Sequence, residues 1–225
     1  MPEILIRPAV PGDAQVAGHL LYMTLGRTAD YLLGHHSQAG RAEQILSQLY
    51  ALPRNRFSYQ YADLAVVDGQ VAGLLLGYPG ASATSLDLHT AGPLLASCGL
   101  AGMARFVARA WPLALVRETE REQYYISHLA VLPAYQGQGL GRCLLAHAES
   151  RARVAGLGQC SLTVEIGNER AYRLYEKVGY RSVQTIETPR LSRRSGLRGI
   201  LPTLLANTDM GRQSWQKRRM VKVLA

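Results

Sequence analysis

The segment that most constrains this chain runs from Tyr124 to Gly141 and reads YYISHLAVLPAYQGQGLG. Its first half is rich in aromatic and branched residues, which favour a β-strand, and Pro133 marks the end of that strand. Glycines follow at 137, 139 and 141. Because these positions carry no side chains, consecutive backbone N–H groups can converge on an anion beside the positive end of the next helix. The segment therefore predicts a phosphate-binding loop between a strand and a helix.

The spacing of these glycines distinguishes the loop from two other classes of phosphate site. It is G-x-G-x-G, whereas a dinucleotide-binding loop has the spacing G-x-G-x-x-G. A nucleoside-triphosphate loop places a Lys-Ser or Lys-Thr pair after its last glycine, and no such pair follows Gly141. Both alternatives are therefore disfavoured.

Two further motifs accompany the loop. A strand end, Leu129-Ala130-Val131-Leu132-Pro133, precedes it, and a second motif follows it, Asn168-x-x-Ala171-x-x-Leu174-Tyr175-Glu176-x-x-Gly179-Tyr180. With the loop Gln136-Gly137-Gln138-Gly139-Leu140-Gly141, these residues resemble the GNAT acyltransferase superfamily, whose loop pattern is Gln/Arg-x-x-Gly-x-Gly/Ala. The motifs of the family are matched over residues 124–187. Elsewhere the sequence is compatible with the family's pattern but carries no motif of it.

The resemblance implies both a chemistry and a set of binding residues. The cosubstrate is acetyl-CoA or another acyl-CoA, and its acyl group passes directly to an acceptor amine, on a small molecule or a protein. Backbone groups of Leu129, Ala130 and Val131 bind the pantetheine arm. The pyrophosphate is held by the turn made of Gln136, Gly137, Gln138, Gly139, Leu140, Gly141 and Arg142. The side chain of Asn168 meets the cofactor arm, and helix capping alone is its alternative role.

Tyr175 is the residue to which the resemblance assigns catalysis. The family commonly places a tyrosine here to protonate the departing CoA thiolate, and a phenol with a pKa near 10 can donate a proton at neutral pH. The alternative is a core tyrosine, because Tyr175 shares a helix face with Ala171, Leu174 and Val178. A second function class also stays open, an acyl-CoA-binding sensor that has lost turnover.

The general base has no clear candidate in the sequence. The family often carries Glu or His four or two residues before Leu-Ala-Val, where this chain has Tyr125 and Ser127. We expect Tyr125 and Ser127 to contact the acceptor substrate, and we leave the general base unassigned. His128 is adjacent, but strict alternation along a strand would turn it to the face opposite Tyr125, Ser127 and Leu129.

The order of the elements indicates the fold class. The predicted order begins with a strand, two helices and a hairpin and continues with strand, helix, strand, helix and strand. This is a mixed α/β order, and no repeat or linker divides it. We expect one α/β domain of the α+β type over residues 1–225, with a mixed, mostly antiparallel sheet flanked by helices. The family's fold further implies that the fourth and fifth strands splay apart and admit the pantetheine arm.

Local signals place the other elements. We expect helices at 13–25 with Asp13 as N-cap, 41–52, 91–116, 139–155 and 168–179, and strands at 3–7, 57–67, 70–78, 159–165, 180–187 and 220–224. Asp68-Gly69 predicts a tight hairpin. A helical insertion at about 87–117 would cover a sheet face or an acceptor pocket, and a homodimer interface is its alternative role.

Charge and composition limit the partners. Of the net charge of +9, residues 190–225 contribute nine basic side chains against Asp209 alone, and a solvated tail is the preferred interpretation. Nucleic-acid binding is disfavoured because no aromatic platform accompanies the arginines, and the arm at 189–214 has mixed signals. The adjacent His35 and His36 lack further ligands, so no metal site is expected.

The expected compartment is the cytoplasm. No leader pattern is present, and the longest nearly uncharged stretch, residues 91–104, is too short to cross a bilayer, so no membrane partner is expected. The three cysteines, Cys98, Cys143 and Cys160, lack the close spacing of a metal or redox motif and are expected to be buried thiols.

Overall fold

The structure, a computed structural model, describes residues 3–34, 40–114, 117–187 and 216–224. Within them one sheet has the strand order β1-β2-β3-β4-β5-β7-β6, and every neighbouring pair is antiparallel except β4 and β5. The strands are β1 Ile4–Pro8, β2 Ala62–Val67, β3 Gln70–Pro79, β4 Tyr124–Val131, β5 Gln159–Glu165, β6 Arg181–Glu187 and β7 Gln216–Val223. The helices are α1 Ala14–Leu25, α2 Arg27–Leu33, α3 Arg41–Ala51, α4 Ala83–Ala114, α5 Leu140–Val154 and α6 Glu169–Lys177. The expected mixed, mostly antiparallel sheet flanked by helices is confirmed.

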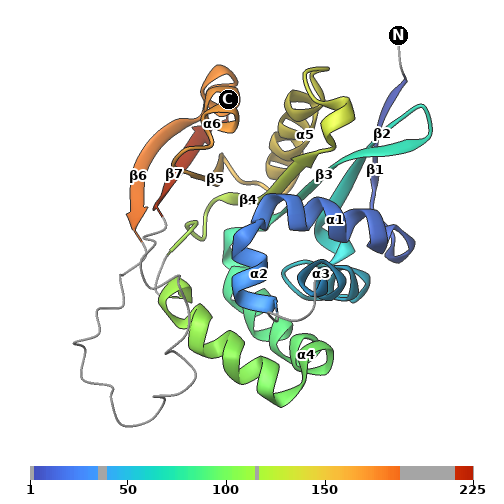
Figure 1. Ribbon diagram of the computed structural model, residues 1–225. Helices are drawn as coiled ribbons and strands as arrows, with labels where there is room; N and C mark the ends of the chain where they lie inside the picture. The colour runs from blue at the N-terminus through green and yellow to red at the C-terminus, as the bar shows by residue number, and fades with distance from the viewer. Residues whose placement is uncertain (1–2, 35–39, 115–116, 188–215, 225) are drawn as a thin grey trace.

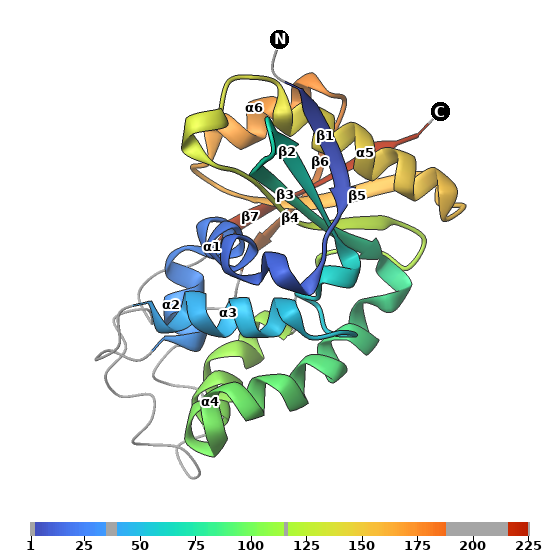
Figure 2. The same cartoon turned by 90° about the vertical axis from the view of Figure 1, so that its right-hand side faces the viewer.

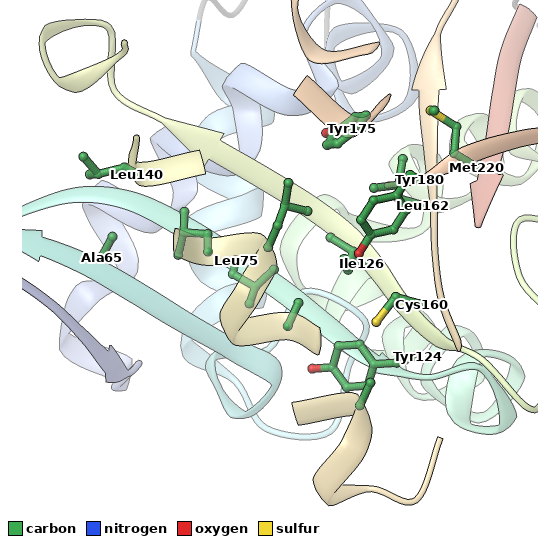
Figure 3. Close-up of a cluster of buried hydrophobic side chains, with 14 of the residues drawn as sticks. Ala65, Leu75, Tyr124, Ile126, Leu140, Cys160, Leu162, Tyr175, Tyr180 and Met220 are labelled. Carbon is green, nitrogen blue, oxygen red and sulfur yellow. The ribbon is translucent and has the colours of Figure 1, made fainter. Parts of the chain in front are cut away.

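Each face of the sheet buries its own hydrophobic layer. On one face, α5 and α6 pack through Leu140 and Tyr175 against β3, β4 and β5, whose Leu162 belongs to the same buried cluster (Figure 3). On the other face, α1 and α3 pack through Leu20 and Leu46 against β2 and β3. The central strands β3 and β4 therefore contribute to both layers, which fixes their position in the molecule.

The hairpin at Asp68-Gly69 is confirmed. Both residues have positive φ, 48° at Asp68 and 80° at Gly69, as a tight two-residue turn between antiparallel strands requires. Strand β2 nevertheless begins at Ala62, five residues later than the sequence pattern predicted. A short 3-10 turn occupies Tyr59–Tyr61, where the Ser58 hydroxyl accepts a hydrogen bond from the Gln60 backbone N–H.

The N-terminal helices depart from the sequence pattern at their ends. Helix α1 begins at Ala14, and Asp13 is at its N-cap position as predicted. The Asp13 carboxylate makes no capping hydrogen bond, because it accepts hydrogen bonds from Arg7 and from the Val10 backbone N–H. Helix α2 lies within the expected connection at 26–40. His35 and His36 lie outside the described residues.

Helix α4 lies on the side of α2 and α3 that faces away from the sheet (Figure 2). It begins well before residue 91 and contains a break at Gly99, whose φ of 68° is not helical. The segment Gly80–Ala110 is long and apolar enough to cross a membrane by length and composition alone, a test that core helices of soluble proteins also pass. Leu86 and Leu94 are buried against the neighbouring helices, whereas Leu88, Leu100 and Val107 are exposed.

Strand β7 lies between β5 and β6, so a segment from late in the chain forms an interior strand of the sheet (Figure 1). The predicted pairing of the last two strands is confirmed, but the sequence did not indicate that β7 also pairs with β5. The solvated-tail interpretation is wrong for β7, because its basic side chains have partners there. Lys222 contacts Glu149 at 2.8 Å, Arg219 contacts Glu120 at 3.0 Å, and Arg218 lies over the Tyr172 ring.

The expectation of three buried thiols holds only for Cys160. Cys98 is half-buried and Cys143 is exposed on α5. The basic arm predicted at 189–214 lies outside the described residues.

Candidate functional site

The parallel strands β4 and β5 pair for only part of their length. The paired residues are Tyr124 with Cys160, Tyr125 with Ser161 and Ile126 with Leu162, after which the strands separate. Figure 1 shows β5, β6 and β7 standing apart from β1–β4 as a second arm of the sheet. The predicted splay of the fourth and fifth strands is therefore present, and it leaves residues 127–131 of β4 without a strand partner on the β5 side.

The backbone of this free edge presents its polar groups alternately to either side. A Cβ added at Gly73 would lie 2.8 Å from the Ala130 carbonyl oxygen, so that oxygen faces β3. Alternation along the strand then directs the backbone groups of Leu129 and Val131 into the gap beside β5. Of the three residues expected to bind pantetheine, Leu129 and Val131 have the orientation for it and Ala130 does not.

A β-bulge in β4 overturns the expectation for His128. Leu76 of β3 pairs with His128 and Gly77 pairs with Ile126, so Ser127 is an extra, half-buried residue without a partner in β3. The extra residue reverses the side-chain alternation, and His128 lies on the same face as Tyr125. Its imidazole contacts Thr24 of α1 and stacks on Phe57.

The glycine loop has the geometry expected of an anion-binding turn. Gly137 and Gly139 have φ of 84° and 88°, the left-handed region that favours glycine, and Gly139 is the N-cap of the 15-residue helix α5. A Cβ at either position would meet no other atom within 4 Å, so the space in front of the loop is open. Gly141 differs, because a Cβ there would lie 3.0 Å from Leu174 of α6.

The side chains of the loop fix its shape. Gln136 Nε2 donates to the Val131 carbonyl oxygen at 2.9 Å, and Gln138 Nε2 donates to the Ala134 carbonyl oxygen at 3.2 Å. Arg170 of α6 donates to Gln136 Oε1 and so joins α6 to the loop. Leu140 is buried beneath the turn, and Arg142 is exposed on the first turn of α5.

Asn168 caps α6. Its Oδ1 accepts a hydrogen bond from the Ala171 backbone N–H at 3.1 Å, so the capping role predicted as the alternative is present in the structure. The amide nitrogen of the same side chain is a second polar group that capping does not use.

Tyr175 lies on the buried face of α6, within the cluster that contains Ile126, Leu162 and Tyr180 (Figure 3). Its ring centroid is 6.2 Å from that of Tyr180. Burial raises the pKa of Tyr175 to about 12, and its hydroxyl has no hydrogen bond to any described residue. The side chain is therefore packed as a core residue, and it carries a hydroxyl proton that no described residue accepts.

A cluster of charges lies on the α1 side of β4. The Tyr125 hydroxyl donates to Glu118 at 3.0 Å, and Glu118 also contacts Lys217 of β7 at 3.3 Å and Arg56 at 3.5 Å. Arg56 makes a second ion pair with Asp87 of α4 at 2.9 Å. Burial alone would raise the pKa of Glu118, but Lys217 and Arg56 outweigh that effect and hold it below its ordinary value.

This cluster was missed from the sequence because its members come from four distant segments. Arg56 precedes β2, Glu118 precedes β4, Asp87 belongs to α4 and Lys217 to β7. The local pattern around each residue carries no signal of the others. Of the two predicted substrate residues, Tyr125 is joined to the cluster by its hydroxyl, and Ser127 occupies the bulge beside it.

The comparisons with known proteins agree with this geometry. The model of the Acetyltransferase (GNAT) family matches residues 36–180. Streptothricin acetyltransferase of Streptomyces lavendulae is 31% identical over 104 residues, 46% of this chain and 50% of that protein. Aminoalkylphosphonate N-acetyltransferase of Salmonella typhimurium is 43% identical over 56 residues, 25% of this chain and 36% of that protein. The chain spans half the length or less of these curated relatives.

Solved structures show the same fold over nearly the whole chain. An N-acetyltransferase from Staphylococcus aureus Mu50 aligns with a TM-score of 0.70 and 22% identity, covering 96% of this chain and 99% of that one. A second acetyltransferase structure aligns with a TM-score of 0.66 and 22% identity, covering 98% of this chain and all of the other. With the family model matching well over half of its residues, the chain belongs to the GNAT acetyltransferase family.

Proposed function

We propose that this protein is an N-acetyltransferase that moves the acetyl group of acetyl-CoA to a primary amine by direct attack. The observation that carries the proposal is the free edge of β4, which leads directly into an open glycine loop at the start of α5. An extended thioester arm ending in a pyrophosphate matches this sequence of an unpaired strand edge and an anion-binding turn.

The binding residues act through their backbone groups. Leu129 offers its N–H and C=O groups, and Val131 its N–H group, to the amides of the pantetheine arm, as a neighbouring strand would. The Val131 carbonyl oxygen accepts a hydrogen bond from Gln136. The backbone N–H groups from Gly137 to Gly141 converge on the pyrophosphate, where the positive end of the α5 dipole adds to the attraction. The Arg142 N–H donates to the Gly139 carbonyl oxygen at 2.9 Å, so Arg142 contributes through its exposed side chain. Gln136 and Arg170 hold the turn in this shape.

Tyr175 supplies a proton to the departing thiolate in this proposal. Acetyl-CoA brings an activated acyl carbon on a thioester, whose leaving group is a thiolate. A C–N bond forms, the C–S bond breaks, the nitrogen releases one proton to solvent, and Tyr175 protonates the sulfur and regains its proton from solvent. Burial raises the pKa of Tyr175. A thiolate held in the same apolar surroundings becomes more basic for the same reason, so the pKa values of the proton donor and of the thiol rise together.

The Gly139→Glu variant tests the binding site. Glutamate would bring a Cβ to a residue with φ of 88° and a carboxylate to the anion site, so acetyl-CoA affinity should fall at least about tenfold through like-charge repulsion. Titration calorimetry with acetyl-CoA measures this loss.

Gly156→Glu is the matched control. Gly156 also has positive φ, 72°, and open space around its Cβ, but it lies beyond the far end of α5. It should carry the same backbone strain and leave acetyl-CoA affinity unchanged. Equal affinities of the Gly139 variant and the wild type would refute the loop assignment. Binding without thiol release across a panel of amines would favour an acyl-CoA sensor.

A further inference from the structure

Two buried polar atoms beside the free edge of β4 have no hydrogen-bond partner in the described part of the chain. They are His128 Nε2 and Arg56 Nε. Both side chains lie against the same ring, because the Phe57 centroid is 5.6 Å from the imidazole centroid and 5.7 Å from the guanidinium carbon of Arg56. A buried polar atom without a partner is costly, so each of these atoms marks a place where a ligand group can bind.

The hydrogen bonds of Thr24 determine the tautomer of His128. The Thr24 hydroxyl donates its one proton to the Leu21 carbonyl oxygen at 2.8 Å. His128 Nδ1 lies 2.9 Å from the same hydroxyl oxygen, and both contacts can be hydrogen bonds at once only if Nδ1 carries a proton and donates it, so we assign this tautomer. The unpaired Nε2 is then a lone pair, and the group that it can receive is a donor such as an N–H.

The surroundings of this lone pair favour an uncharged donor. Burial, Arg56 and Lys217 lower the pKa of His128 to about 3 against the opposing effect of Glu118, so the imidazole is neutral at physiological pH. Two tyrosines also lie here, Tyr125 and Tyr78, whose rings are in contact. Burial raises the pKa of both above the ordinary value, so both hydroxyls are uncharged at physiological pH. Glu118 and Asp87 are already paired with Lys217 and Arg56, so in this cluster of described residues two carboxylates balance two cations and favour no ammonium group.

We propose that the acceptor amine binds uncharged and donates an N–H to His128 Nε2, while Arg56 Nε donates to an oxygen carried next to that amine. This inference rests on the acetyl transfer proposed above. The acceptor class that meets both conditions is an α-amino amide, as found at the N-terminus of a peptide. Its carbonyl oxygen lies beside the amine, and the same carbonyl makes the amine less basic.

The difference in basicity is large enough to decide the acceptor. An α-amine has a pKa of about 8, and an alkylamine such as the lysine side chain has a pKa of about 10.4. At pH 7.5 the uncharged fraction of the α-amine is then roughly two hundred times larger. An uncharged amine can attack the acyl carbon at once, since its nitrogen has a free lone pair and loses its proton to solvent only as the C–N bond forms.

The first test uses the wild-type protein with three acceptors, glycinamide, propylamine and spermidine, and follows thiol release from acetyl-CoA. We expect the highest kcat/KM for glycinamide at pH 7.5. Its pH profile should rise through the pKa of the acceptor itself, near 8, while the propylamine profile should still be rising above pH 9. Acid limbs near pH 6.5 for both acceptors, or a preference for spermidine, would overturn the inference.

The second test changes His128, which carries the lone pair on Nε2, and Thr24, which fixes the tautomer of His128. His128→Phe keeps an aromatic ring on Phe57 and deletes Nε2, so kcat/KM for glycinamide should fall about ten- to a hundredfold with acetyl-CoA affinity unchanged. His128→Gln restores a carbonyl acceptor and should recover part of that loss. Thr24→Val removes the partner of Nδ1 and should raise the KM for glycinamide in a well-folded protein. His19→Gln, on the exposed side of α1, is the control.

The possible failures are distinct. Full glycinamide activity in folded His128→Phe and Thr24→Val proteins would refute the inference and leave the acetyl transfer standing. Absence of acetyl-CoA binding by the wild type would refute the proposed function and this inference together.

Discussion

Tyr175 combines two properties that are usually separate, a buried ring and a hydroxyl that the fold leaves without a hydrogen bond to described residues. A tyrosine kept only for packing gains little from such a hydroxyl, because burying a polar group costs free energy unless it is paired. The unused proton is therefore consistent with a role towards the leaving thiolate.

Replacing Tyr175 with phenylalanine separates the two roles. We expect kcat to fall about 10²- to 10⁴-fold, the usual effect of losing a general acid, with acetyl-CoA affinity close to that of the wild type. Stability at pH 7 should hardly change, since the substitution breaks no hydrogen bond among the described residues. The measurements are kcat and a thermal melt on both proteins. Full turnover in a folded Phe variant would return Tyr175 to a packing role.

The pH dependence of stability gives a second readout for the same variant. The pKa of Tyr175 is about 12 in the folded chain and close to its ordinary value of 10 in the unfolded chain. The contribution of Tyr175 is therefore fully present below pH 10 and is lost as the pH rises towards 12, because the unfolded chain ionises first. The Phe variant should lose less stability than the wild type between pH 7 and pH 11.

At the scale of single elements, the bulge in β4 decides which side chains lie on the α1 face of the sheet. Without the extra residue Ser127, alternation would direct His128 away from Thr24 and Phe57. The bulge is opposed by Gly77 of β3, where an added Cβ would lie 2.7 Å from the Tyr124 ring and 3.0 Å from the Tyr125 carbonyl oxygen. The glycine thus makes room for the irregular strand beside it.

Gly77→Ala tests this dependence. The new methyl group should displace the Tyr124 ring or β4 itself, and we expect a loss of about 1–3 kcal/mol in the free energy of unfolding, measured by urea denaturation. Gly92→Ala is the matched control, since its Cβ would meet nothing within 4 Å and its helical position favours alanine. Equal stability of the Gly77 variant and the wild type would show that the strand tolerates a side chain there.

The same bulge marks the limit of what the sequence could predict. Strand and helix signals are local, so the hairpin at Asp68-Gly69, the helix capped by Asn168 and the glycine loop were all predicted from a few neighbouring residues. The face on which His128 lies depends on pairing with β3, more than fifty residues away in the chain. The partners of Glu118 likewise come from segments that no local pattern connects.

At the scale of the whole molecule, β7 completes the arm of the sheet that stands apart from β1–β4. It pairs with β5 along one edge and with β6 along the other, and in the described residues β6 has no second neighbour. Its basic residues also neutralise Glu118, Glu120 and Glu149. The residues from 216 onward are therefore part of the core of the fold, although their composition resembles a basic tail.

A chain shortened after Glu187 should lose this arm. Removing β7 exposes β5, leaves β6 without a partner and leaves Glu149 buried without its lysine, so we expect no cooperative thermal transition. Circular dichroism during heating measures this. A full-length protein with Lys217→Gln and Lys222→Gln distinguishes the loss of charge from the loss of the strand. A shortened chain that melted at the wild-type midpoint would contradict this account.

The position of β7 also has a consequence during synthesis. The strands β1 to β4 and the loop before α5 are complete long before residues 216–223 have left the ribosome, and the second arm cannot form until they have. While translation continues, β5 therefore has a partner on its β4 side alone and β6 lacks its partner β7, so both can pair with other chains. The arm of the sheet that faces β4 across the gap is thus completed last, so a nascent chain has the glycine loop before it has the second arm.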